Sequence, residues 1–254
     1  VIKSEDLFIS SPSSGAEMLE LSPGVRIQKS QGGGGSPVIR GFEANRVLIV
    51  VDGVRMNNAI YRSGHLQNSI TIDPSNIERA EIIFGSSSVG YGSDAMGGVI
   101  HYYTKNPILK NSEKISSSFT TNFNSANNSV SNNFNTSLSS DNWGSITSIS
   151  ISKYGDIKMG KNRNHGFSDW GLNPIYSKNS RYSYYSEPSI NSDNNIQRNT
   201  GYSQVDLFQK FLVNLGDSSL LNLNIQFSES SDIDRFDQLS IPKDNSLKYS
   251  EWYY

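Results

Sequence analysis

Three histidines are the residues of this chain best suited to bind a metal ion or a haem iron: His65, His101 and His165. Neutral imidazole is a standard iron ligand, and its basicity depends on what its second ring nitrogen bonds. His65 lies in the polar segment 62–68 rather than on an apolar strand, which favours an accessible ring. The residues alone leave two interpretations open: an iron ligand, or a solvated loop histidine that bonds a neighbouring backbone group.

Other residue groups that could do chemistry give weaker indications. Asp232, Asp234 and Asp237 could hold Ca²⁺, but they lack the glycine and distal glutamate of an EF-hand loop, so a solvated acidic loop is favoured. The glycines of 90–98 precede an expected strand, whereas a dinucleotide loop needs a helix there, and 32–35 lack the Lys-Ser/Thr of a P-loop. With no cysteine, thiolate metal sites and cysteine nucleophiles are excluded. No catalytic residues are predicted, and the chain is not expected to be an enzyme.

Composition limits the class of protein further. The 254 residues are 35% hydrophobic with a net charge of −2, and no run of about 18 apolar residues suggests a membrane-spanning helix. A strand of a membrane barrel needs only about 9–11 residues and exposes alternate ones to lipid, so a membrane protein of that kind remains open. The near-neutral charge argues against a nucleic-acid partner.

Residues 1–106 read as a small α+β unit. Apolar runs of strand character are separated by glycine turns and stand at 47–51, 82–84 and 99–103. Residues 17–21 predict a short helix, ended by Ser-Pro-Gly. Asp73 is the expected N-cap of a helical turn that opens with Pro74.

Residues 107–254 are rich in serine and asparagine and alternate between apolar and polar residues. The clearest alternation is in 221–227, where Leu, Leu, Ile and Phe interleave with Asn, Asn and Gln. Such alternation predicts strands with one apolar and one polar face, here at 115–123, 130–138, 147–151, 204–215 and 221–227.

Two features favour a membrane barrel over a soluble β-sandwich for these strands. The strands are about ten residues long, where globular strands usually have about five or six. Tight connections at 139–142 and 216–217 contrast with a long polar loop at 155–201, as in outer-membrane barrels. An apolar sheet with open edges is not stable in lipid, so we expect further strands beyond Tyr254 and interpret both chain ends as cuts.

The order of motifs in residues 4–105 resembles the plug domain of TonB-dependent outer-membrane receptors. The motifs that carry the resemblance are MLELSPGVRIQ, Arg40-Gly41, Asp52-Gly53-Val54, the IERAEI run at 77–82, Tyr91-Gly92-Ser93 and the GGVI run at 97–100. The resemblance implies an α+β plug domain over 1–106, followed over 107–254 by about five strands of a large antiparallel transmembrane β-barrel. About 22 strands are expected in a receptor of this class.

The resemblance also implies a function and a location. Such receptors import scarce nutrients through the bacterial outer membrane, with the plug facing the periplasm and with TonB supplying energy through a TonB box, which is not visible before Val1. The segment with Tyr61 and the Gly-His-Leu around His65 resembles haem and haemoglobin receptors, in which a plug histidine ligates haem iron. His65 and Tyr61 are therefore the expected haem-binding residues, with haem as transported ligand rather than tightly bound cofactor and no other metal.

Further roles implied by the resemblance are less specific. His165, Tyr182 and Tyr184 are expected loop contacts with ligand, whereas His101 is expected to be packed or to face the barrel wall. The charged residues Arg40, Arg79 and Glu81 are expected to pair with the barrel, the alternative being ordinary surface salt bridges.

The identity of the cargo and of the partners stays open in this interpretation. Alternatives to haem are a siderophore, cobalamin, a glycan or a peptide, and a second alternative is a non-transporting plug-type subunit of an outer-membrane or secretion complex. Expected partners are TonB, outer-membrane lipid and a surface lipoprotein or haemoprotein.

Overall fold

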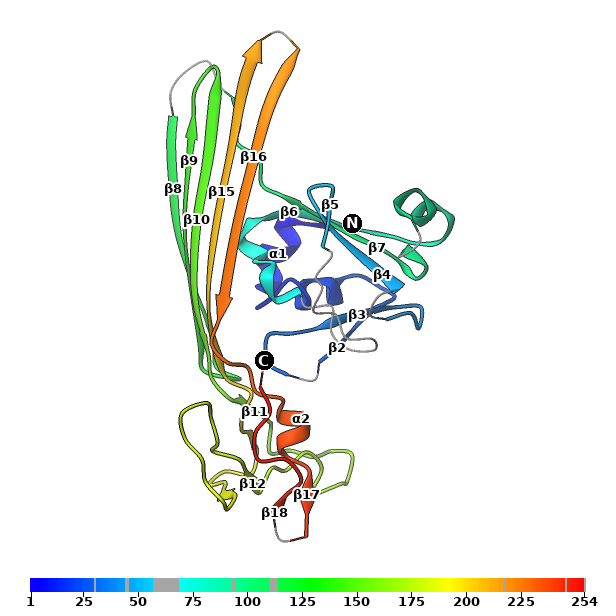
Figure 1. Ribbon diagram of the computed structural model, residues 1–254, viewed down its shortest axis with the longest axis vertical. Coiled ribbons are helices and arrows are strands. Elements are labelled where there is room, and N and C mark those ends of the chain that lie inside the picture. The colour runs from blue at the N-terminus through cyan, green and yellow to red at the C-terminus, as the bar shows by residue number, and fades with distance from the viewer. Residues whose placement is uncertain are drawn as a thin grey trace.

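The computed structural model describes residues 1–29, 31–43, 46–56, 69–92, 95–109, 114–216, 218–244 and 246–253. Five long strands form a curved wall, and a smaller mixed unit, residues 1–109, packs against one face of it (Figure 1). We call these two parts the wall and the N-terminal unit. Longer connections gather at one end of the wall.

The N-terminal unit is built on a five-stranded sheet in the order β1-β6-β7-β4-β5. β4 and β7 pair in parallel, and the other neighbours are antiparallel. Its strands are β1 (Ile2–Lys3), β4 (Val47–Val51), β5 (Val54–Arg55), β6 (Ile77–Ile83) and β7 (Gly98–Thr104), and a hairpin of β2 (Val25–Gln28) and β3 (Ser36–Ile39) lies beside them. The helices are α1 (Ser4–Ser10) and the 3₁₀ turns η1 (Glu17–Leu21), η3 (Ser69–Thr71), η4 (Pro74–Asn76) and η5 (Gly85–Tyr91).

Local sequence explains the turns that shape this unit. Asp52 and Gly53 both have positive φ, 48° and 85°, as the two-residue turn between β4 and β5 requires, and Asp-Gly is a preferred pair there. Asp73 caps η4 by accepting a hydrogen bond from the Ser75 amide at 2.9 Å, as predicted. The core beneath is apolar and closed, and the fully buried Tyr102 hydroxyl donates to the Gly15 carbonyl at 2.9 Å.

The wall is an antiparallel sheet in which each strand pairs with its neighbours in the order β16-β15-β10-β9-β8. Its strands are β8 (Lys114–Asn124), β9 (Ser129–Ser139), β10 (Trp143–Tyr154), β15 (Tyr202–Gly216) and β16 (Ser219–Ser230). Polar residues face the N-terminal unit, whereas Leu221, Leu223, Ile225 and Phe227 of β16 are half exposed on the outer face. This arrangement confirms the predicted mixed unit followed by barrel-type strands.

Connections at the two ends of the wall differ in length. One end carries the tight turns after β9 and β15, and the other carries residues 155–201 and 231–253 (Figure 1). These long connections contain β11 (Ile157–Lys158), β12 (Ile175–Tyr176), β13 (Ser189–Ile190), β14 (Ile196–Gln197), α2 (Phe236–Leu239), β17 (Pro242–Lys243) and β18 (Ser246–Leu247). Among the described residues, no helix is long and apolar enough to cross a membrane.

The predicted domain division at residue 106 falls between the two sheets but stays a prediction. β7 ends at Thr104 and β8 begins at Lys114. The sequence did not predict α1, whose single buried side chain is Leu7, nor β1, which has only two residues. Both elements are too short to show a clear apolar period.

A glycine loop of the N-terminal unit fits closely against the loop end of the wall. A Cβ atom on Gly33 would lie 2.4 Å from the Tyr202 ring and 2.8 Å from Ile70, and the φ of Gly33 is +67°. Tyr202 and Ile70 form a small apolar cluster with Ile233, packed against Tyr154. Gly33 therefore lets the backbone approach Tyr202 and Ile70 closely, and a larger residue at this position would have to displace those side chains or the loop.

We predict that Gly33→Ala loosens this contact, at a cost of about 1–3 kcal/mol from crowding and backbone strain. In the full-length protein, hydrogen exchange in β3 should become faster than in the wild type. Gly90→Ala is the matched control, because a Cβ there has nothing within 4 Å. Equal exchange in the wild type and in Gly33→Ala would contradict the prediction.

Candidate functional site

An ion pair between Asp52 and Lys210 joins the N-terminal unit to the wall. Nζ of Lys210 lies 3.0 Å from Oδ2 of Asp52 and 2.9 Å from Oγ1 of Thr104. Asn224 of β16 also donates to Oδ2 of Asp52 at 2.7 Å. Two wall strands thus bind one turn of the N-terminal unit.

The electrostatics of this contact favour the charged form of Asp52. Burial alone would raise the pKa of the carboxyl group, but hydrogen bonds from the Thr104 hydroxyl and amide and from Lys210 lower it overall. The Lys210 side chain is only 2% exposed. An ammonium group so deeply buried requires a counter-charge, which Asp52 provides.

A second set of contacts joins the N-terminal unit to the wall nearer the loop end. Ser150 donates to Oδ2 of Asp73 at 2.5 Å, the Tyr154 hydroxyl donates to the Ser13 carbonyl at 2.9 Å, and Gln204 donates to the Ile70 carbonyl at 2.8 Å. These contacts border a polar cavity of about 410 Å³, which Asp73 and Asp206 both line. Polar contacts and a polar cavity therefore lie between the two parts at this end of the boundary.

His101 is packed inside the N-terminal unit. The sequence predicted that it would either be packed or face the barrel wall, and the structure shows the first. Its Nε2 accepts a hydrogen bond from the Gly53 amide at 3.0 Å, and its ring stacks on Tyr103 with centroids 4.0 Å apart. Burial lowers the pKa of His101, so the neutral ring that accepts from Gly53 is favoured. His101 thus supports the turn that carries Asp52.

The charged residues expected to pair with the barrel have their described contacts elsewhere. Nε of Arg79 lies 2.8 Å from Glu81 on the same strand, and the guanidinium group covers the Tyr103 ring at 3.7 Å. The Arg40 guanidinium lies 5.1 Å from the Phe84 ring centroid. Pairing of these residues with the barrel therefore stays a prediction, and among the described residues the ion pair across the boundary is Asp52–Lys210.

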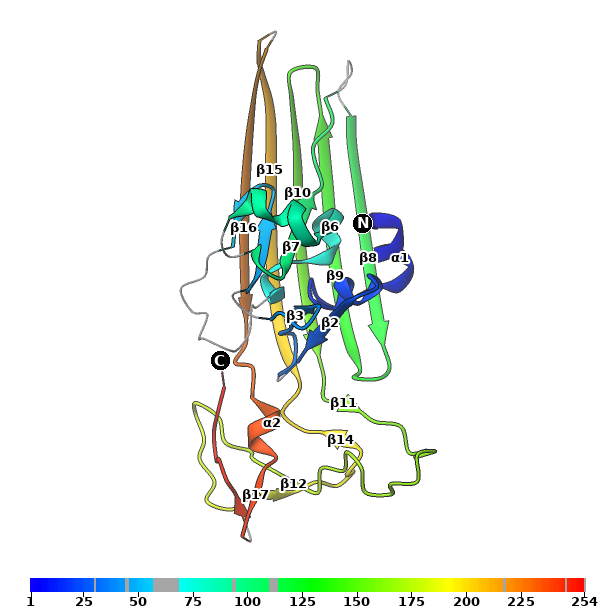
Figure 2. The same cartoon turned by 90° about the vertical axis from the view of Figure 1, so that its right-hand side faces the viewer.

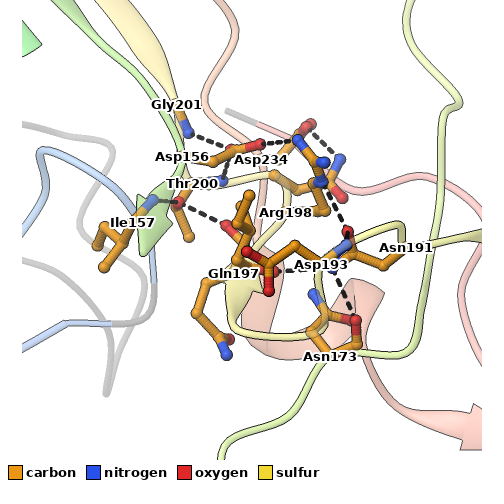
Figure 3. A network of polar contacts seen from close by, with 12 residues as sticks. Asp156, Ile157, Asn173, Asn191, Asp193, Gln197, Arg198, Thr200, Gly201 and Asp234 are labelled. Atoms are coloured by element: carbon orange, nitrogen blue, oxygen red, sulfur yellow. Dashed lines mark hydrogen bonds and ion pairs between the residues drawn. The ribbon is translucent and has the colours of Figure 1, made fainter. Parts of the chain in front are cut away.

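The long loops are held together by a polar network around Asp156 (Figure 3). Oδ1 of Asp156 accepts from the Thr200 and Gly201 amides at 3.0 and 3.1 Å, and Oδ2 lies 3.4 Å from Arg198. Arg198 also donates to Asn191, whose amide group bonds the Asn173 carbonyl at 2.7 Å. The network fixes both ends of the 155–201 loop next to the start of β15.

Acidic residues of the second long loop have partners of their own. Asp232 pairs with Arg181 at 2.8 Å, Asn199 donates to Asp234 at 2.8 Å, and Asp237 pairs with Arg235 at 2.7 Å. Among the described residues no group of three or more His, Cys, Asp or Glu side chains is placed to hold a metal ion.

His165 lies in an exposed aromatic group of the long loop. Its ring centroid is 5.6 Å from that of Phe167 and 5.3 Å from that of Trp170. Nδ1 accepts from the Phe167 amide at 3.1 Å, which in the neutral ring places the proton on Nε2. His165 in this arrangement offers a hydrogen-bond donor, and iron ligation through Nε2 would require the loss of that contact.

The remaining predicted site residues fall in two groups. Tyr182 and Tyr184 are exposed by 89% and 72% in the long loop, so they are accessible, and their contact with ligand stays a prediction. His65 and Tyr61 lie outside the described residues.

Sequence reasoning missed the residues that join the two parts: Asp52, Thr104, Lys210 and Asn224. One signal was present, because Lys210 stands on the polar face of a predicted strand, where a charge needs a partner. The partner itself is 158 residues away in sequence, and no local pattern identifies it.

Comparison with known proteins identifies the N-terminal unit. Residues 1–99 match the family model described as "TonB-dependent Receptor Plug Domain". The N-terminal unit is the plug domain of a TonB-dependent receptor. The wall strands against which it packs are therefore the barrel part of such a receptor, and the predicted outer-membrane location is confirmed.

Curated relatives match part of the chain. The chain is 40% identical over 106 residues to "Vitamin B12 transporter BtuB" of Vibrio vulnificus, covering 41% of this chain and 17% of that protein. It is 42% identical over 90 residues to "Hemin receptor" of Yersinia pestis, covering 35% and 13%. The chain thus spans less than a fifth of the length of these relatives. Their names are those of transporters and receptors, in agreement with the prediction that the chain is not an enzyme.

Solved structures share the fold of nearly the whole chain. A mutant of the ferric enterobactin receptor of Pseudomonas aeruginosa aligns with a TM-score of 0.61 at 18% identity, over 97% of this chain and 34% of that one. "Copper transporter OprC" aligns with a TM-score of 0.65 at 15% identity, over 87% and 29%. At these identities the likeness concerns the fold alone.

We predict that Lys210→Met weakens the seating of the plug, because the buried Asp52 carboxylate loses its counter-charge. The expected cost is about 3 kcal/mol. In the full-length protein, hydrogen exchange of the Gly53 and Thr104 amides should become roughly a hundredfold faster.

Lys153→Met is the matched control, because Lys153 is exposed on the outer face. The double variant Asp52→Asn with Lys210→Met should recover part of the protection, since it leaves no unpaired charge. Unchanged exchange in Lys210→Met would show that the ion pair does not hold the plug.

Proposed function

We propose that the full-length protein imports haem, or iron taken from haemoproteins, across the outer membrane in a TonB-dependent manner. Two kinds of observation support haem. Relatives include the Yersinia receptor above and "Heme/hemopexin utilization protein C" of Haemophilus influenzae, which is 36% identical over 130 residues, 49% of this chain and 17% of that protein. The Gly64-His65-Leu66 segment supplies a histidine of the required type.

The observation that carries the transport function is the plug seated against the inner face of barrel strands through polar contacts. In the proposed cycle, cargo binds at the loop end, and TonB then pulls on the periplasmic side of the plug. The Asp52–Lys210 pair and the hydrogen bonds of Asp73 and Gln204 must open, and water can take their place. Haem is cargo in this proposal, with no tightly bound cofactor, and a surface lipoprotein or haemoprotein would deliver it.

A second candidate cargo is cobalamin, favoured by the 40% identity to the vitamin B12 transporter of Vibrio vulnificus. Siderophore, glycan or peptide cargo belongs to the same transporter class, and the non-transporting subunit remains the alternative from another class. The identities to relatives named for haem and for vitamin B12 are similar, so cargo binding must be measured directly.

We predict that the full-length protein binds haemin with a shift of its Soret band, and that His65→Ala removes or strongly reduces this shift because the iron loses an imidazole ligand. Haemin and cyanocobalamin are titrated in parallel, the first by absorbance and the second by calorimetry.

Lys153→Ala is the control, since Lys153 is exposed on the outer face of the wall and has no predicted contact with the ligand. No Soret shift in the wild type would refute haem as cargo, and an unchanged shift in His65→Ala would remove His65 from the ligand role. Binding of cyanocobalamin alone would establish the second candidate.

A further inference from the structure

The turn between β4 and β5 is held by two consecutive residues of β7, His101 and Tyr102. The Asp52 amide donates to the Tyr102 carbonyl at 3.0 Å, and the Gly53 amide donates to Nε2 of His101 at 3.0 Å. A backbone carbonyl accepts at any physiological pH, whereas an imidazole nitrogen accepts only while it carries no proton. The hydrogen bond of Gly53 therefore depends on the charge of a titratable group.

The contacts of the His101 ring determine which nitrogen carries the proton. Because Nε2 accepts from Gly53, the proton of the neutral ring is on Nδ1, which lies 3.3 Å from the Tyr91 hydroxyl. The Tyr103 ring stacks on the imidazole with centroids 4.0 Å apart, and His101 is only 7% exposed. This packing holds Nε2 toward the turn.

Protonation of His101 would replace this attractive contact by a repulsive one. An imidazolium ring has a proton on both nitrogens, so two N–H groups would face each other across the 3.0 Å between Nε2 and the Gly53 nitrogen. Either the ring or the turn must then move. The ring is stacked and buried, whereas the turn continues into β5, whose two residues are exposed. The turn is therefore the part that moves more easily.

Movement of this turn acts on the contact between the plug and the wall. The carboxylate of Asp52, the first residue of the turn, lies 3.0 Å from Nζ of Lys210 and accepts from Asn224 at 2.7 Å. The Lys210 side chain is 2% exposed, so an Asp52 that moves away leaves a buried ammonium group without its counter-charge. The charge of His101 is thereby linked to the seating of the plug.

The surroundings of His101 favour its neutral form. The titratable and charged groups around the ring are Asp52 of the β4–β5 turn, Arg79 and Glu81 of β6, Tyr91 of η5 and Tyr103 of β7. Its neighbour on β4 is the uncharged Val50. Burial has the largest effect and lowers the pKa of His101; the two carboxylates oppose this effect, and Arg79 adds to it. The bond to Gly53 is therefore complete above the ordinary histidine pKa of about 6.5 and is lost as the pH falls through the lower pKa of the folded protein.

We propose that His101 is a pH-sensitive switch for the seating of the plug: protonation of its ring releases the Asp52–Gly53 turn and loosens the Asp52–Lys210 contact with the wall. The plug is held firmly at neutral pH and less firmly in acid. The proton acts inside the plug and not on the cargo, so the switch does not depend on which cargo the receptor carries.

Hydrogen exchange in the full-length receptor, measured without cargo, tests this switch at three amides. The Gly53 amide reports its own bond to the imidazole, and the Thr104 amide, which donates to Asp52 at 2.9 Å, reports the carboxylate. The Gly15 amide donates to the Ile72 carbonyl at 3.0 Å and is the reference for the plug core. Exchange is recorded at about pH 7.5 and about pH 5.5, on either side of the ordinary pKa of histidine, and each rate is divided by that of an unstructured peptide at the same pH.

We expect the protection of the Gly53 and Thr104 amides to fall roughly tenfold between the two pH values, while that of Gly15 changes little. At about pH 5.5 an accessible imidazole with a pKa near 6.5 is protonated about ten to one. The open turn gains this preference over the closed turn, in which burial and the Gly53 amide oppose protonation.

The decisive variant is His101→Gln, whose amide oxygen can accept from Gly53 and does not titrate. Its protection should be retained and should not depend on pH. His101→Phe keeps an aromatic ring without the acceptor, so Gly53 should exchange fast at both pH values. His165→Gln is the matched control, because it removes a histidine of the exposed loop, and it should respond to pH as the wild type does. Unchanged protection of Gly15 shows that a variant is folded.

Three results would overturn the proposal. The first is an equal response of Gly53, Thr104 and Gly15 to pH in the wild type. The second is an undiminished response in His101→Gln, which would show that a carboxylate titrates instead of the imidazole. The third is a response of Gly53 without one of Thr104, which would show that His101 holds the turn but does not act on the contact with the wall.

Discussion

The buried ammonium group of Lys210 is the constraint on which the assembly of this structure depends. Its side chain is 2% exposed, and its two acceptors, Asp52 and Thr104, both belong to the plug. Without the plug, Lys210 would face a hydrated lumen, and without the wall, Asp52 would keep only its contacts to Thr104. Since a buried charge without a partner costs several kcal/mol, each part supplies what the other requires.

The strand pattern explains why such a contact can exist at all. Alternation along β15 puts Val205, Leu207 and Phe211 on the outer face and leaves Asp206 and Lys210 on the inner one. This division was predictable from the sequence, because successive side chains of a strand point to opposite faces of the sheet. The positions of the long strands followed from the same pattern, with ends that differ by a few residues. The Asp52–Gly53 turn and the Asp73 cap were also readable, since each depends on neighbours in sequence.

The sequence could not predict contacts between distant segments, nor the hydrogen-bond partners and proton positions of individual side chains. The pairing of Asp52 with Lys210 joins the plug to a strand that follows the long loop, and it arises only when the plug packs against the wall. Figure 2 shows this wall behind the plug sheet. Resemblance to the family suggested Arg79 and Glu81 for that role. In the described residues they bond each other on one strand, and their pairing with the barrel stays a prediction. The proton position of His165 likewise depends on a single backbone amide.

The contacts inside the plug core and those between the plug and the wall differ in the free energy needed to break them. The plug core is apolar, with Val47, Ile49 and Ile100 almost wholly buried, so opening it exposes hydrocarbon to water. Its described boundary with the wall combines hydrogen bonds to serine, asparagine, glutamine and tyrosine with one ion pair and the small apolar cluster of Ile70, Tyr202 and Ile233. Each neutral bond contributes only about 0.5–1.5 kcal/mol net, because water replaces the lost partner. Opening the polar contacts of the boundary therefore costs less free energy per contact than opening the plug core. The ion pair is the exception, and its position at the β4–β5 turn makes that turn the part of the plug held most firmly.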